Sequence, residues 1–181
     1  MDTPRLVGLT RSLEEATALD GVVRLLEPLV DTAFASGKRG EVLRGDWLGH
    51  ALHPVLTDVV LGTWGSATIL DLIGGRDSQA AAQRLLGVSL LAVGPTAWSG
   101  WAEWASAPDR DKRVGVVHAV SNGAAAAIFA SSWLARRRGE HAAGVRRSLA
   151  GAAVATVGGY LGGHLAASRK VGTHDPAFDV S

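Results

Sequence analysis

Four histidines and one glutamate lie close to the ends of long apolar segments of this chain. His50 and His53 stand three residues apart, where a polar stretch turns into the first apolar segment. Glu103, His118 and His164 each lie near one end of a later segment. Ionisable side chains within membrane-spanning segments are costly, usually face the protein interior and mark functional sites. Imidazole is also a common ligand of haem iron, zinc, copper and non-haem iron. These five residues therefore form the candidate site.

The apolar segments that carry these residues are long enough to cross a membrane. The third and fourth contain 22 and 21 residues without a formal charge, and a transmembrane helix needs about 20. Neither shows the polar stripe of a helix on the surface of a soluble bundle, which is the alternative architecture. The sequence predicts four spans, over residues 47–73, 85–105, 114–135 and 148–168.

Alternating spans would bring the candidate site residues to one membrane face. His118 and His164 would then lie roughly 6 Å below the boundary, at about 1.5 Å per residue. Small residues spaced four apart in the fourth span, such as Gly151, Ala155 and Gly159, favour close helix packing. We predict an all-α fold, a four-helix transmembrane bundle with an N-terminal amphipathic surface helix. Its parts are an N-terminal helical extension (1–45), the membrane domain (46–170) and a mobile tail (171–181).

Local patterns predict further details. Ser12 followed by Glu15 matches a capping box at a helix start, and Pro28 is expected to kink or divide that helix. Asp46 is a predicted N-cap of the first span. Asp71, at the other end of that span, is expected to pair with Arg76 or Arg84.

The composition excludes several functional classes. There are no cysteines, which rules out disulfides, thiolate-bound clusters and thioether-linked haem. The formal net charge of +1 does not point to nucleic acid, and the acidic N-terminus lacks the apolar core of a cleaved signal peptide. We expect a multi-pass protein of the inner (plasma) membrane. Four spans place both termini on one side; basic residues are nearly balanced across the loops, and we assign that side to the cytoplasm.

Three interpretations of the polar cluster compete. The first is b-type haem held by two histidines from different helices, chosen from His53, His118, His164 and His50. Arg110, Lys112 or Arg113 would then meet the haem propionates. The second is a zinc or iron site with ligands from the set His50, His53, Glu103, His118 and His164. The third is a cofactor-free structural or transport module in which these groups satisfy one another.

Several ordered blocks resemble an uncharacterised bacterial membrane family, Domain of Unknown Function 2231. They cover roughly residues 45–175, with the segments 49–58, 99–104, 113–119 and 162–165 carrying the similarity. The first begins Gly-His-Ala-Leu-His-Pro, and the second contains Glu103, where the family commonly has Asp. Val60 stands where the family often has Pro.

The resemblance implies a four-span protein of unassigned activity. Relatives are sometimes fused to a Rieske or cytochrome-like module, which implies an electron-transfer setting, although a chain without cysteine cannot itself hold a Rieske centre. Our prediction is an electron-transfer or binding subunit rather than a stand-alone enzyme. Its expected partners are the lipid bilayer, an iron–sulfur or cytochrome redox protein, and a second copy in a homodimer.

Overall fold

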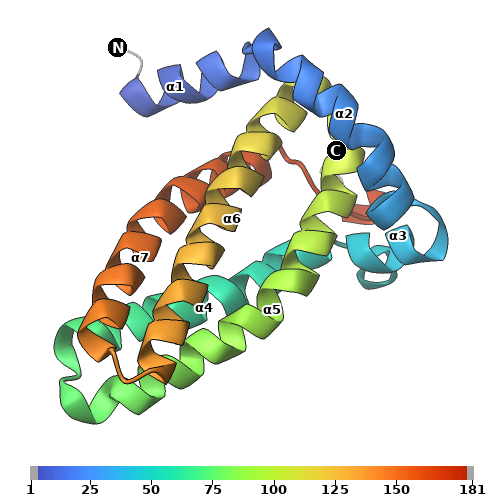
Figure 1. The fold of residues 1–181 in the computed structure, drawn as a ribbon. Coiled ribbons are helices and arrows are strands. Elements are labelled where there is room, and N and C mark those ends of the chain that lie inside the picture. The colour runs from blue at the N-terminus through green and yellow to red at the C-terminus, as the bar shows by residue number, and fades with distance from the viewer. Residues whose placement is uncertain (1–3, 179–181) are drawn as a thin grey trace. The chain divides into compact units, whose positions relative to one another are not determined.

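The computed structural model describes residues 4–178, and these form helices joined by short turns, with no strand among them (Figure 1). Three short helices come first: α1 (Arg5–Glu14), α2 (Asp20–Val30) and α3 (Gly37–Arg44). Four long helices follow: α4 (Leu52–Ile73), α5 (Gln79–Ala105), α6 (Asp109–Arg137) and α7 (His141–Gly163). A single π-helical turn, His164–Ser168, extends α7.

The four predicted spans are confirmed as helices. Within the described residues, four helices are long and apolar enough to cross a membrane: Leu52–Ile73, Arg76–Ala105, Asp109–Arg137 and His141–Ser168. Three of them extend beyond the predicted ends because charged residues continue the helices. Asp109 and Asp111 lie in the first turn of α6, and Arg136 and Arg137 lie in its last turn. Those signs match the helix dipole, which favours acids at the N-terminus and bases at the C-terminus.

The N-terminal region differs from its predicted pattern. Ser12 lies inside α1, where its hydroxyl donates to the carbonyl of Gly8, so the predicted capping box is wrong. Pro28 sits within α2 without ending it. Asp46 lies in a short 3₁₀ turn and makes no cap for α4. Residues 4–45 therefore hold three α-helices rather than one, and their position at a membrane surface stays a prediction.

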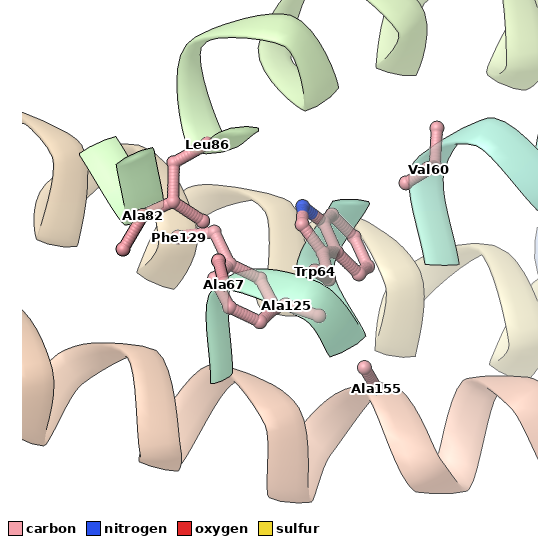
Figure 2. Packing of buried hydrophobic residues seen from close by; sticks show 8 residues of the cluster. All are labelled: Val60, Trp64, Ala67, Ala82, Leu86, Ala125, Phe129 and Ala155. Carbon is pink, nitrogen blue, oxygen red and sulfur yellow. The ribbon is translucent and has the colours of Figure 1, made fainter. Parts of the chain in front are cut away.

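The chain divides into two compact units. The first comprises Met1–His53, Ala97–Ala119 and Gly159–Ser181, and the second comprises Pro54–Thr96 and Val120–Gly158. In the second unit all four long helices contribute to one apolar core (Figure 2). The Trp64 and Phe129 rings stack with their centroids 4.5 Å apart. Small residues, among them Ala67 and Ala125, complete this core and let the helices approach closely.

Two glycines of α7, Gly151 and Gly158, pack closely against α6. A Cβ added at Gly151 would stand 3.1 Å from the Phe129 ring, so the side chain of a larger residue would displace that ring. Gly158 lies in the same way against Asn122. Gly159, the third member of the predicted series, differs: an added Cβ there would meet no neighbouring atom within 4 Å in the described part of the chain, so the spacing of small residues predicts the contact with α6 only in part.

A buried ion pair also belongs to the second unit. Asp71 lies 2.5 Å from Nη2 of Arg136, and the two side chains are 2% and 0% exposed. The expected pairing of Asp71 with Arg76 or Arg84 is therefore wrong. Arg136 also donates to Ser132 and Ser148, so the charged group is held by a polar network inside the helices.

The core of the first unit joins the N-terminal helices to the long ones. Val23 and Val30 of α2 are buried against Trp104 of α5 and Val116 of α6. The indole nitrogen of Trp104 donates to the carbonyl of Lys112, which satisfies the ring's polar atom. Trp98, by contrast, is 51% exposed, in keeping with the aromatic belts of membrane proteins.

Candidate functional site

Two of the predicted histidines face each other in the first unit. His53 is the second residue of α4, and His118 lies in α6. Their ring centroids are 6.3 Å apart, with an angle of 77° between the ring planes. The turn that leads into α4 depends on Gly49, whose φ of 74° favours glycine. Pro54 fits the first turn of α4, where its missing N–H has no helical partner.

Each of these two rings rests against a glycine of a neighbouring helix. A Cβ added at Gly100 of α5 would stand 2.8 Å from Cε1 of His53. A Cβ added at Gly162 of α7 would stand 2.8 Å from Cε1 of His118. Sequence reasoning did not assign this role, although both glycines lie in the blocks that carry the family resemblance. The four long helices thus meet at this pair, each through a histidine or a glycine.

A hydroxyl group orients the first ring. Nδ1 of His53 lies 3.3 Å from Oγ of Ser99, one residue before Gly100 on α5. When Nδ1 carries the proton and donates to this oxygen, the ring's lone pair is on Nε2, the nitrogen that is then able to bind a metal. Ser99 is fully buried, so its position is fixed by the packing of α5. It was not predicted as a partner.

The other three candidate residues have partners of their own. His164 lies with Nε2 2.8 Å from a carboxylate oxygen of Glu14 in α1. His50 lies with Nδ1 3.1 Å from the carbonyl of Ala51, and its backbone forms a bridge with His174. Across residues 4–178, no group of three or more histidine, aspartate or glutamate side chains is arranged to hold a metal ion. His50, Glu103 and His164 thus each have a contact outside the pair His53–His118.

Glu103 is held by the C-terminal segment. One carboxylate oxygen accepts hydrogen bonds from both the backbone N–H and the hydroxyl of Thr173, at 2.8 and 3.1 Å. The other is buried and has no hydrogen-bond partner in the described part of the chain. Asp175 also donates its N–H to the carbonyl of Gly49. The predicted tail therefore reaches the site as far as residue 175, and its last three residues, 179–181, lie outside the described residues.

Acidic residues of the N-terminal helices pair with basic residues at the ends of α6 and α7. Asp20 and Glu27 of α2 bind Arg113 and Lys112, at 2.6 and 2.7 Å. These two bases, considered for haem propionates, are thus already engaged. The two acids stand seven residues apart, on one face of α2, which is the sequence signal for this contact.

The same contact predicts a pH dependence. The hydrogen bond from Arg113 holds the pKa of Asp20 below its ordinary value of 3.8. A lowered pKa stabilises the fold above the unfolded-state pKa, and this contribution is lost as pH falls through the folded-state pKa. Asp20→Asn should lower the thermal midpoint slightly at pH 7, and the difference from wild type should shrink as the pH falls below 3.8 and vanish once the pH lies below the lowered pKa of Asp20 in the folded protein.

The control for that experiment is the exposed Asp77, which lies in the turn before α5. Asp77→Asn should leave the midpoint unchanged across the same pH range. A difference between Asp20→Asn and wild type that persisted in acid would mean that Asp20 contributes through packing rather than through its charge.

The family comparison identifies the chain. A family model described as a predicted membrane protein (DUF2231) matches residues 49–175. The chain belongs to this family. No curated protein and no solved structure matches it. All five predicted site residues of this DUF2231 protein lie within the matched range, whereas the acids Glu14, Asp20 and Glu27 lie before it.

Proposed function

We propose that this DUF2231 membrane protein is an electron-transfer subunit that binds b-type haem between His53 and His118. The observation that carries the proposal is the facing pair of imidazoles, contributed by two helices long and apolar enough to span a membrane. Histidine is a common ligand of haem iron, and bundle cores often build cofactor sites from side chains on facing helices, so these two residues would be able to hold the group.

The spacing of the two rings agrees with this role. An imidazole nitrogen binds a transition metal at about 2.0 Å, so two histidines that would hold one metal between them must have rings that lie close together. The centroids of His53 and His118 are 6.3 Å apart. Ser99, whose hydroxyl lies 3.3 Å from Nδ1 of His53, could supply the outer partner that metal-bound histidines usually have.

The number of available ligands favours haem over a small ion. A zinc or non-haem iron site takes at least three protein ligands. The described residues offer no group of three, whereas the porphyrin brings four nitrogens of its own and needs only the two histidines. His50 and His164, the other proposed haem ligands, serve other contacts in this arrangement.

When bound, haem carries one electron at a time through the change between ferrous and ferric iron. The chain's own residues would bind the group, fix the two rings and exclude water; no substrate chemistry is assigned to them. The proposal extends to a location in the inner (plasma) membrane with cytoplasmic termini, an iron–sulfur or cytochrome partner, and a homodimer.

The visible spectrum of the protein purified in detergent, with haem supplied during expression, tests this proposal. We expect a Soret band that shifts on reduction with dithionite, with one haem for each chain. His53→Ala and His118→Ala should each reduce the haem content at least about tenfold, because an axial ligand is lost. His141→Ala is the matched control, since His141 begins α7 at the other end of the membrane helix from His164, and it should retain its haem.

Two outcomes would overturn the proposal. A colourless protein with stoichiometric zinc or iron would favour the small-ion site of His50, His53, Glu103, His118 and His164. A colourless protein without metal would favour the cofactor-free module. The contacts His164–Glu14 and Glu103–Thr173 support that alternative, because they satisfy these groups within the protein.

A further inference from the structure

A groove of about 480 Å³ lies between α1 and the end of α7 in the first unit. Val7 and Arg11 line it from α1, and Gly159, Tyr160 and Gly163 line it from α7. Its lining contains both apolar surface and charged groups of both signs. It is separate from the pair His53–His118, neither of which lines it.

The groove is hollow where α7 carries glycines. A Cβ added at Gly159 or Gly163 would meet no neighbouring atom within 4 Å in the described part of the chain. On the same helix, Gly151 and Gly162 lie against the rings of Phe129 and His118. The two open glycines therefore do not serve helix packing, and they leave a channel along α7 beside the half-exposed ring of Tyr160.

Two arginines, Arg11 and Arg169, and one carboxylate, Glu14, also line the groove, so these side chains carry a formal excess of one positive charge. Arg11 is exposed and forms no ion pair among residues 4–178. Arg169, just beyond the span His141–Ser168, binds Asp111 and Glu14 through Nε, while its buried Nη2 has no hydrogen-bond partner in the described residues. A buried unsatisfied donor is costly and points to a missing acceptor.

Along the membrane helix, the lining of the groove changes from charged residues at the end of the span to apolar surface further inside it. Arg169 lies at the end of the span, and Gly159 lies ten residues further inside it, or about 15 Å at 1.5 Å per residue. A lipid has the same order along the membrane normal, with the phosphate at the boundary and the acyl chain below it. Basic residues near the boundary recognise anionic headgroups.

We propose that this groove binds one phospholipid with an anionic headgroup. Its phosphate lies by Arg11 and Arg169, and an acyl chain lies along Gly159 and Gly163. The lipid also covers Val7, which is 40% exposed without it. The site links α1 to α7 through a molecule of the bilayer, and it does not depend on haem.

The test measures binding of phosphatidylglycerol and phosphatidylcholine to the detergent-purified protein by native mass spectrometry. Wild type should retain phosphatidylglycerol in preference. Arg11→Gln should weaken that binding about fivefold, which corresponds to about 1 kcal/mol for one basic residue near a membrane surface. Gly159→Leu should abolish it by filling the channel, and its folding is protected because the new side chain meets open space and helix propensity improves.

Matched controls separate the groove from the rest of the surface. Arg5→Gln removes a charge from the same helix outside the groove, and Gly62→Leu adds the same side chain at another open helical glycine. Both should bind lipid as wild type does. Equal retention of phosphatidylglycerol by every variant would overturn the proposal. Saturation by inorganic phosphate alone, with no preference between the two lipids, would also overturn it, because the acyl chain would then contribute nothing.

Discussion

Replacement of Arg136 by alanine is expected to lower the free energy of unfolding by about 3–5 kcal/mol, because it leaves the buried carboxylate of Asp71 without its partner. The Asp71 side chain is 2% exposed, so water cannot take the place of the guanidinium group. The loss extends to Ser132 and Ser148, whose hydroxyls accept hydrogen bonds from Arg136. Denaturant titration of the protein in detergent micelles, followed by circular dichroism, measures this loss.

A double substitution separates the cost of an unpaired charge from the value of the pair. Asp71→Leu combined with Arg136→Met removes both charges and keeps apolar volume, so it should cost far less than either single alanine substitution. Arg76→Ala is the control, because Arg76 is an exposed residue of the turn after α4, and its effect should stay within about 0.5 kcal/mol. A loss for Arg76→Ala as large as that for Arg136→Ala would contradict the assignment of Arg136 as the partner.

The Asp71 pairing shows which part of the fold could not be predicted from the sequence. The lengths of the apolar segments predict the four helices, since only length and composition are needed to recognise a span. The partner of a buried charge depends on how the helices pack. Arg76 and Arg84 are near Asp71 in the chain, whereas Arg136 reaches it from α6, 65 residues later. Proximity along the chain was therefore a poor guide here.

For the candidate site, too, the sequence predicts some contacts between residues and misses others. The convergence of His53 and His118 follows from alternating spans, and the structure brings these two rings together. The same argument placed His164 and Glu103 beside them. It did not consider residues 1–45 and 171–175, which supply Glu14 to His164 and Thr173 to Glu103. Polar segments outside the spans thus provide partners that hydrophobic periodicity cannot reveal.

The misread capping box has a local cause. Ser12 and Glu15 match the spacing of a helix start, but the same residues occur at the end of α1. A serine within a helix is able to donate to the carbonyl four residues earlier, and Ser12 donates in this way to Gly8. The pattern alone therefore does not decide between a helix start and a helix end.

Replacement of Gly162 by leucine is expected to disrupt the histidine pair. A Cβ at this position would stand 2.8 Å from Cε1 of His118, so the ring must move. Overpacking of this kind costs about 1–3 kcal/mol, whereas the exchange of glycine for a good helix former returns at most about 1 kcal/mol. The net effect should be a lower unfolding free energy, and Gly100→Leu should act in the same way on His53.

The matched control is Gly62→Leu, which makes the same exchange in α4 where an added Cβ meets no neighbouring atom of the described residues. The Gly62→Leu variant gains helix propensity and its new side chain meets no ring, so its stability should equal or exceed that of wild type. Denaturation measures this contrast whether or not a cofactor is present, and the Soret band of the same samples reports the haem. If haem binds between the two rings, Gly162→Leu should lose it and Gly62→Leu should keep it. Equal stability of the Gly62 and Gly162 variants would instead mean that the His118 ring does not rest on α7, and the support that this contact gives to the pair His53–His118 would fail with it.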